Sequence, residues 1–256
     1  MKCADLIRLL EEEFPVKYAV AGDKTGFLVG DREKEIHHVF VAVDATEETI
    51  EEAIESGADF LLTHHPMIYA PMPSVTSDTV NGRRVMKLLR HDLCCMATHT
   101  NYDSCRMADL AVERLGMTEC QTLEEVADGF GIGKAGRLPQ EMTLRECALL
   151  VKEKFQIPSV KYFGNGDQKV LLAGICPGSG RSVIGACHHL GVQVLITGDV
   201  DHHTGIDEAD NFLPIIDAGH YGIEHIYIED MRQFLEKECP ELKVSAAKIR
   251  HPFETL

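Results

Sequence analysis

Short apolar strands alternate with helices along most of the chain, and this alternation limits the fold more than any other feature of the sequence. Buried strands are expected in both halves, at residues 39–43, 60–62, 93–97, 170–175, 192–197 and 213–217. Helical spacing of apolar residues predicts helices around them, at residues 3–14, 44–56, 82–90, 104–115, 144–155, 182–190 and 221–238. Strands that alternate with helices in this way pair in parallel, so the sequence predicts an α/β fold.

Glycine marks the expected division of the chain. Four glycines fall within eight residues between residues 127 and 138, which is typical of a linker. We therefore predict two α/β lobes, residues 1–127 and residues 128–256. A turn signal at residues 164–167 further predicts a β-hairpin early in the second lobe.

The two predicted lobes resemble each other in sequence. Residues 57–65 and 191–199 each run from a glycine through an apolar strand to a threonine followed by polar residues. A second similarity links His99 and Asp103 with His220 and Glu224, since both pairs are spaced by four and follow a strand. Two similar lobes that face each other would bring their strand ends into one cleft. The offsets of the two similarities differ, so the internal repeat is a hypothesis.

Charge and composition exclude several classes of protein. The formal net charge of -16 comes from 41 acidic and 25 basic residues, and no basic patch is evident, so nucleic-acid binding is not expected. The first residues do not resemble a signal peptide, and no apolar run approaches the roughly 20 residues that span a membrane. Nine scattered cysteines without a C-x-x-C pair fit a reducing compartment, so we expect a cytoplasmic protein.

Histidines, in contrast, are clustered, and the clusters indicate metal binding. Eight of the thirteen histidines form four groups: His64 with His65, His188 with His189, His202 with His203, and His220 with His225. The first pair follows a strand, where open α/β sheets place ligand-binding residues. His220 and Glu224 are one helical turn apart, so both side chains lie on one helix face.

Five residues are the candidate metal ligands. Asp103 lies between a strand and a helix, where it serves either as a ligand or as a helix N-cap. The full set contains three imidazoles and two carboxylates: His64, His65, Asp103, His220 and Glu224. This number suits two divalent ions of the Zn, Mn or Fe type better than one closed tetrahedral site.

Two further motifs leave alternatives open. Residues 199–203 contain Asp199, Asp201, His202 and His203, which either orient the ligands of the first site or form the site themselves. Residues 178–181, Gly-Ser-Gly-Arg, form either a phosphate-binding turn or an ordinary tight turn between a strand and a helix. No Gly-x-Ser-x-Gly elbow is present, which disfavours covalent catalysis by serine.

Seven motifs in this order resemble the Nif-three-like dinuclear-metal proteins, also called GTP cyclohydrolase I type 2 homologues. The motifs are Asp23–Gly30, Thr63–Pro66, Thr98–Asp103, Gly131–Gly136, Gly178–Gly180, Thr197–His203 and Ala218–Glu224. The resemblance implies the same five ligands, with Glu224 bridging the ions. It also implies two related lobes per subunit, assembled into a toroidal homo-hexamer with the metals facing an inner cavity. Lys24 and Lys134 replace an asparagine and an arginine that are usual in the family, which affects expected substrate contacts only.

The leading hypothesis is a metal-dependent hydrolase that acts on a small molecule such as a nucleotide. The paired ions would activate water, and His99 and His203 are candidates for moving the proton. The resemblance suggests opening of the guanine ring of GTP. The alternative is a metal-carrying binding or regulatory protein without turnover.

Overall fold

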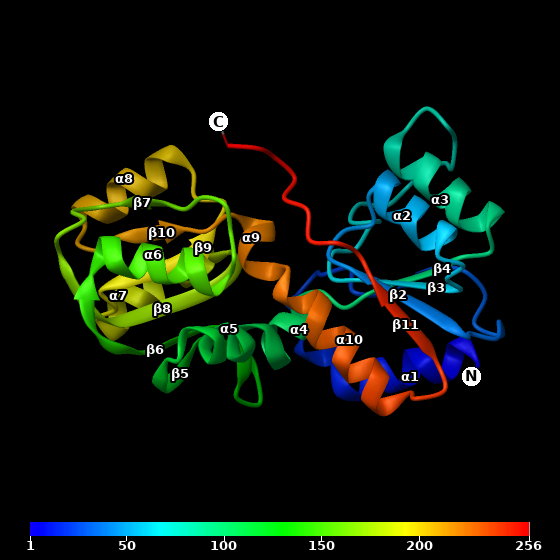
Figure 1. Ribbon diagram of the computed structural model, residues 1–256, viewed down its shortest axis with the longest axis horizontal. Coiled ribbons are helices and arrows are strands. Elements are labelled where there is room, and N and C mark those ends of the chain that lie inside the picture. Colours follow the sequence, from blue (N-terminus) through cyan, green and yellow to red (C-terminus); the bar gives the residue numbers. More distant parts are fainter. Residues whose placement is uncertain (256) are drawn as a thin grey trace. The chain divides into compact units, whose positions relative to one another are not determined.

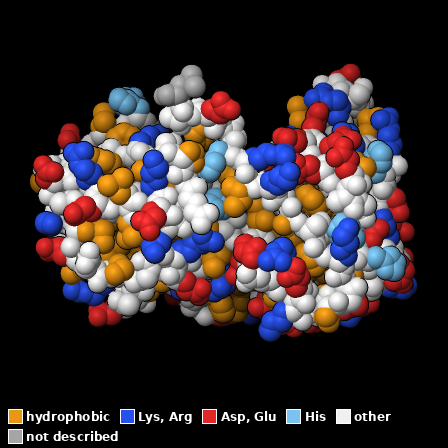
Figure 2. Space-filling model, viewed as in Figure 1, with side chains coloured by type: hydrophobic (Ala, Val, Ile, Leu, Met, Phe, Trp, Pro, Cys, Tyr) orange, Lys and Arg blue, Asp and Glu red, His pale blue; other side chains and the backbone are white. Residues whose placement is uncertain are grey.

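The computed structural model describes residues 1–255 and divides the chain into two compact units (Figure 1). The first unit consists of residues 1–102 and 227–249, and the second consists of residues 103–226 and the segment from residue 250 onward. Each unit contains one sheet with helices packed on it, so the predicted α/β class is confirmed. Acidic and basic side chains are interspersed on the visible face of both units (Figure 2).

The sheet of the first unit has five strands in the order β1-β4-β3-β2-β11. Their bounds are β1 (Gly26–Val29), β2 (His38–Ala42), β3 (Phe60–Thr63), β4 (Cys94–Ala97) and β11 (Lys243–Ala246). All neighbours pair in parallel except β1, which is antiparallel to β4. The helices are α1 (Cys3–Glu13), the 3-10 turn Val16–Tyr18, α2 (Glu47–Glu55), α3 (Val80–Arg90), α4 (Thr100–Tyr102) and α10 (Ile226–Glu238).

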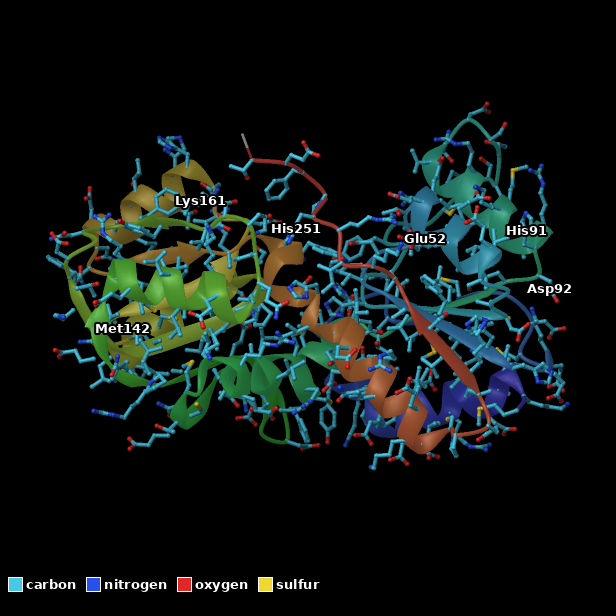
Figure 3. All side chains as sticks on the ribbon, viewed as in Figure 1. Glu52, His91, Asp92, Met142, Lys161 and His251 are labelled. Atoms are coloured by element: carbon cyan, nitrogen blue, oxygen red, sulfur yellow. The ribbon has the colours of Figure 1, made fainter. Side chains whose placement is uncertain are left out.

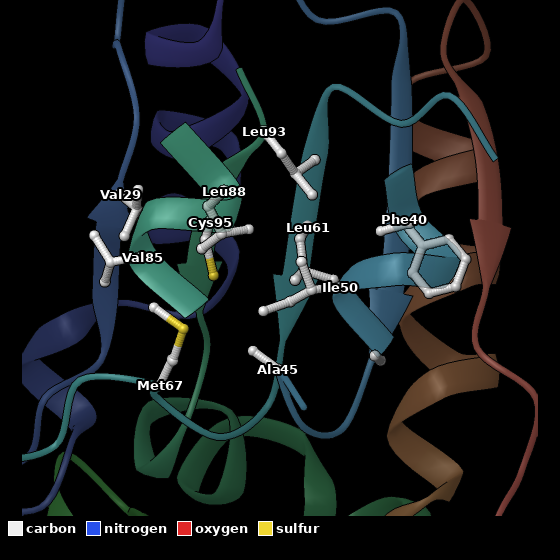
Figure 4. Close-up of a cluster of buried hydrophobic side chains, with 12 residues drawn as sticks. Val29, Phe40, Ala45, Ile50, Leu61, Met67, Val85, Leu88, Leu93 and Cys95 are labelled. Carbon is white, nitrogen blue, oxygen red and sulfur yellow. The ribbon is translucent and has the colours of Figure 1, made fainter. Parts of the chain in front are cut away.

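Helices cover both faces of this sheet, which explains why its strands are apolar without alternation. Phe40, Leu61 and Cys95 are paired across β2, β3 and β4, so their side chains point to the same face. There they pack against Ile50 of α2 and Leu88 of α3 in a buried cluster (Figure 4). The helices α1 and α10 lie on the other face (Figure 1).

The sheet of the second unit has six strands in the order β5-β6-β8-β9-β10-β7. Their bounds are β5 (Thr118–Ala127), β6 (Phe130–Thr143), β7 (Lys161–Phe163), β8 (Lys169–Ser179), β9 (Val194–Gly198) and β10 (Ile215–Asp217). β8, β9 and β10 pair in parallel, and the other pairings are antiparallel. The helices are the π-helical turn Asp103–Met107, α5 (Ala108–Leu115), α6 (Leu144–Lys154), the 3-10 turn Gly180–Val183, α7 (Ile184–Leu190), α8 (His202–Asp210) and α9 (His220–Glu224).

The glycine-rich segment that we predicted to be a linker is instead a β-hairpin within the second unit. β5 and β6 pair across it, and Asp128 and Gly129 form its turn with φ angles of 54° and 84°. Positive φ at both central residues is the type I′ pattern that an Asp-Gly pair favours. The expected boundary between residues 127 and 128 would cut this hairpin, whereas the units divide after residues 102 and 226.

The predicted hairpin at residues 164–167 is also wrong. β7 and β8 flank this turn, but β7 pairs with β10 rather than with β8. Both edges of β8 are already occupied by β6 and β9, so the preceding strand joins the sheet at its far edge.

Two further findings concern membrane-spanning segments and the cysteines. No helix within residues 1–255 is long and apolar enough to cross a membrane. All nine cysteines are free thiols, and most of them are buried as small apolar side chains.

Candidate metal centre

Three histidines of the first unit lie at the carboxyl edge of its sheet. β3 ends at Thr63, which pairs with Ala97 at the end of β4, so the residues that follow the two strands emerge side by side. One nitrogen from each of His64, His65 and His99 lies within 4.8 Å of the other two. The expected position of the His64–His65 pair at a strand end is confirmed.

The rings of His64 and His65 are held through Nδ1. Nδ1 of His64 donates to the carbonyl oxygen of Thr98 at 2.9 Å, and Nδ1 of His65 donates to Oδ1 of Asp44 at 2.8 Å. Because a carbonyl and a carboxylate can only accept, the proton of each neutral ring lies on Nδ1. Nε2 therefore carries the lone pair, as in metal-binding histidines that are oriented by an outer acceptor.

His99 has the same arrangement. Its Nδ1 donates to Oδ1 of Asp23 at 2.7 Å, and Asp23 also accepts from the backbone and hydroxyl of Thr100 at 3.1 and 2.5 Å. Burial raises the pKa of Asp23, but the hydrogen bonds from His99 and Thr100 outweigh it and hold the pKa well below its usual range. Asp23 therefore remains a carboxylate that can fix the imidazole. The sequence-based hypothesis gave His99 a proton-moving role, and the structure places His99 in a group of histidines that could also hold a metal ion.

The second unit carries a second group of three candidate ligands. His220 and Glu224 face each other across one turn of α9, with Nε2 3.1 Å from Oε2. Two donors bound to one ion at about 2.0 to 2.2 Å lie about 3 Å apart, so this spacing fits a shared ion. Nδ1 of His220 donates to Oδ2 of Asp199 at 2.9 Å. A carboxylate oxygen of Asp103 lies within 4.8 Å of one from Glu224.

Asp103 is not a helix N-cap. The helical segment begins at Thr100, where Asp23 accepts the exposed backbone N–H, and Asp103 starts a π-helical turn further along. A π-helical turn inserts an extra residue and so changes which side chains share a helix face, and such turns occur often at functional sites. The sequence left two roles open for Asp103, metal ligand or helix N-cap, and the position of Asp103 inside the helical segment excludes the N-cap.

Gly178 lies against the Glu224 carboxylate. It has a φ of 74°, and a Cβ at this position would overlap Oε1 of Glu224 and lie 3.5 Å from Nε2 of His220. The Gly-Ser-Gly motif therefore makes room for a ligand side chain. Its other glycine, Gly180, donates its N–H to Oγ1 of Thr197 at 2.7 Å, so that donor is used within the protein rather than for a phosphate.

The polar residues of the cluster at residues 199–203 have different roles. Asp199 orients His220, and Asp201 is the N-cap of α8, where it accepts from the backbone of Thr204 at 3.0 Å. His202 and His203 are exposed on α8. Within residues 1–255, no metal-binding group includes these last three residues, which supports the orienting role for this segment.

Sequence reasoning missed the orienting carboxylates Asp23 and Asp44. They lie 76 and 21 residues from the histidines that they hold. Neither carries a local signal that links it to its histidine, since Asp44 lies at the start of a predicted helix and Asp23 at the start of a motif.

A cavity of about 640 Å³ opens in the second unit beside this group of ligands. Asp199 and Gly219, which adjoin His220, contribute to its lining. Lys161 lies in the wall, with Nζ 3.0 Å from Oδ2 of Asp217 (Figure 3). The volume is within the range of sites that bind small molecules.

Comparison with known proteins settles the family. A model of the Duf34/NIF3 (NGG1p interacting factor 3) family matches residues 1–252. The chain belongs to this family. The resemblance drawn from the seven sequence motifs is thereby confirmed.

Relatives and solved structures agree with this assignment over nearly the whole chain. A protein of Clostridium perfringens named GTP cyclohydrolase 1 type 2 homolog is 36% identical over 260 residues, which cover 99% of each chain. A protein of the same name from Clostridium acetobutylicum is 33% identical over 92% of this chain and 90% of its own. A crystal structure of a hypothetical protein of Staphylococcus aureus matches with a TM-score of 0.92 and 27% identity, covering 100% of this chain and 99% of the other. A Bacillus cereus protein related to NIF3 has the same TM-score at 22% identity, covers 100% of this chain and 99% of its own, and supports the fold.

Proposed function

We propose that this protein is a metal-dependent hydrolase with two divalent ions per subunit. The observation that carries the proposal is that four histidines, His64, His65, His99 and His220, each have Nδ1 held by an oxygen acceptor. Rings held in this way present Nε2 in one direction, which is what a metal site requires.

The ligand count supports two ions in one centre. Each unit supplies three candidate ligands, and neither set alone fills the coordination of two ions. We propose, as the sequence resemblance implies, that the five predicted ligands serve one centre, in which Glu224 would contact both ions. Only imidazole and carboxylate donors are present in the two sets, a combination that suits Zn, Mn or Fe.

The chemistry proposed for this centre is hydrolysis of a small molecule. A pair of divalent ions supplies a water of lowered pKa and polarises the bond to be broken. The cavity next to Asp199 and Gly219 would hold the substrate. His203 stays a candidate for moving the proton, from its exposed position on α8.

The names of the relatives suggest which substrates to test first. Two relatives are named GTP cyclohydrolase 1 type 2 homolog, so we propose a nucleotide such as GTP as the first candidate. We also propose a homo-hexamer and a reducing, cytoplasmic environment, the latter supported by the nine free thiols. The family description as an interacting factor keeps a second candidate function, a metal-carrying binding protein without turnover.

Metal content and turnover together test this proposal. Protein purified without chelator should hold close to two equivalents of metal per chain by elemental analysis, and GTP should be consumed. Glu224→Gln should lower both the metal content and the turnover, whereas His189→Ala, a change of an exposed histidine on α7, should lower neither.

The possible outcomes separate the two functions. Two equivalents of metal without turnover on any nucleotide would favour the binding protein over the hydrolase. Metal content unaffected by Glu224→Gln would refute the centre itself.

A further inference from the structure

We propose that a cavity between α2 and α3 is a second ligand site, which binds the phosphate group of a small molecule. The cavity has a volume of about 340 Å³ and lies wholly within the first unit, whose metal ligands do not line it. Four cationic side chains line it, together with a single carboxylate, that of Glu47. The cations are Arg83, Arg84, Lys87 and Arg90.

This concentration of positive charge is unusual for the chain. The protein has a net charge of -16, and sequence analysis predicted no basic patch. The helix α3 contradicts that prediction, because it contains four basic residues and no acidic residue among its eleven. Arg83, Lys87 and Arg90 are spaced by three, four and seven residues, so they share one helix face. Arg84, next to Arg83, also lines the cavity. The apolar side chains of Ile50 and Met86 complete the wall.

Two of the cations have no protein partner within residues 1–255. Arg83 is paired with Glu47, with Nε 3.0 Å from Oε1, and Lys87 is paired with Glu51. Arg84 and Arg90 form no such pair, and Nε of Arg84 is buried without a hydrogen-bond acceptor. A buried guanidinium nitrogen without an acceptor costs free energy, which a bound anion would recover.

A phosphate group fits these donors better than a carboxylate ligand would. Guanidinium groups present donors in a planar fork that binds phosphate oxygens in pairs, and several such groups can share a dianion. Ser77 also lines the cavity, and its carbonyl oxygen accepts from Nη1 of Arg83 at 3.2 Å. The volume accommodates a small phosphate ester or a free phosphate ion, and both sources present the same group to the arginines.

The surroundings disfavour a nucleic acid as the occupant. Five of the nine residues of α2 are glutamates, and this helix flanks the cavity. Glu52 on α2 and His91 at the end of α3 mark the two helices in Figure 3. A long phosphate backbone would have to pass these carboxylates, whereas a small molecule inside the cavity would not.

Calorimetric titration of the full-length, metal-loaded protein tests the proposal. The probes are ribose 5-phosphate, ribose as its uncharged counterpart, inorganic phosphate, and a single-stranded oligonucleotide. Ribose 5-phosphate should bind with a sub-millimolar Kd, and ribose should not bind. Arg84→Gln and Arg90→Gln should each weaken binding at least tenfold. Arg8→Gln on α1 removes the same charge away from the cavity and should leave the Kd unchanged.

Each alternative result has a defined meaning. Arg90 is exposed, so Arg90→Gln preserves the fold and keeps the test valid even if Arg84→Gln destabilises the protein. Equal affinity for inorganic phosphate would support the site with free phosphate as its source, and tighter binding of ribose 5-phosphate would support an ester. Binding that survives both arginine variants would place the phosphate elsewhere, including the metal centre, and would overturn the proposal. Tighter binding of the oligonucleotide, lost in the same variants, would overturn it in favour of a nucleic acid.

Discussion

Replacing Gly178 with alanine should weaken metal binding while leaving the fold intact. The change has two separable effects. A residue other than glycine in the left-handed region costs about 1–2 kcal/mol, and the φ of Gly178 is 74°. In addition, the new Cβ would overlap Oε1 of Glu224, so this carboxylate must move away from the position that it shares with His220.

A matched glycine separates these effects. Gly191 has a φ of 68°, and nothing lies within 4 Å of a Cβ built there. Gly191→Ala therefore carries the same backbone cost of about 1–2 kcal/mol without touching a ligand. Both variants should lower the free energy of unfolding of the metal-free protein by similar amounts. Only Gly178→Ala should weaken metal affinity, by at least about tenfold, since even the loss of an outer partner of a ligand weakens affinity about 10–100-fold.

Competition with a chelating dye measures the metal affinity of both variants, and urea unfolding of the metal-free proteins measures their stability. The reasoning would be refuted if Gly178→Ala bound metal as tightly as the wild type. It would also fail if Gly191→Ala lost as much metal as Gly178→Ala, because backbone strain alone would then explain the effect.

Further predictions concern the core, the pH dependence of stability and the ligands. Leu61→Ala, in the centre of the first sheet, should lower the free energy of unfolding by about 2–5 kcal/mol in urea titrations. Burial lowers the pKa of His38, so wild-type stability should fall as the pH drops below about 6.5, the value in the unfolded chain. His38→Gln should reduce this dependence without removing it, because burial also lowers the pKa of His225. Asp199→Asn should weaken metal affinity about 10–100-fold through the loosened ring of His220. His99→Ala should lower metal content in elemental analysis, whereas a residue that only moves protons would leave it unchanged.

The sequence predicted the parts of the fold in which local pattern and burial agree. The strands β2, β3 and β4 are covered on both faces, so their apolar runs were unambiguous. The β5–β6 hairpin was missed because its polar, half-exposed strands lack such runs, and the count of glycines outweighed the Asp128-Gly129 turn signal. β11 joins β2 from the other end of the chain, a pairing that no local pattern indicates.

The candidate site shows the same limit. His64 with His65, and His220 with Glu224, are pairs within a few residues, so sequence spacing could identify them. The carboxylates that fix the rings come from distant parts of the chain, and only the fold brings them to their histidines.

Comparison of the two units supports the proposal that His99 is a metal ligand. In each unit, a histidine follows the second of two adjacent parallel strands: His99 follows β4, and His220 follows β10. Each donates from Nδ1 to an aspartate, at 2.7 Å to Asp23 and at 2.9 Å to Asp199. A carboxylate that holds Nδ1 leaves the lone pair of Nε2 in a fixed direction, and the grouping of a His99 nitrogen with those of His64 and His65 within 4.8 Å favours coordination of an ion. The internal repeat seen in the sequence thus corresponds to a repeated way of holding an imidazole, and this equivalence makes His99 the sixth candidate ligand.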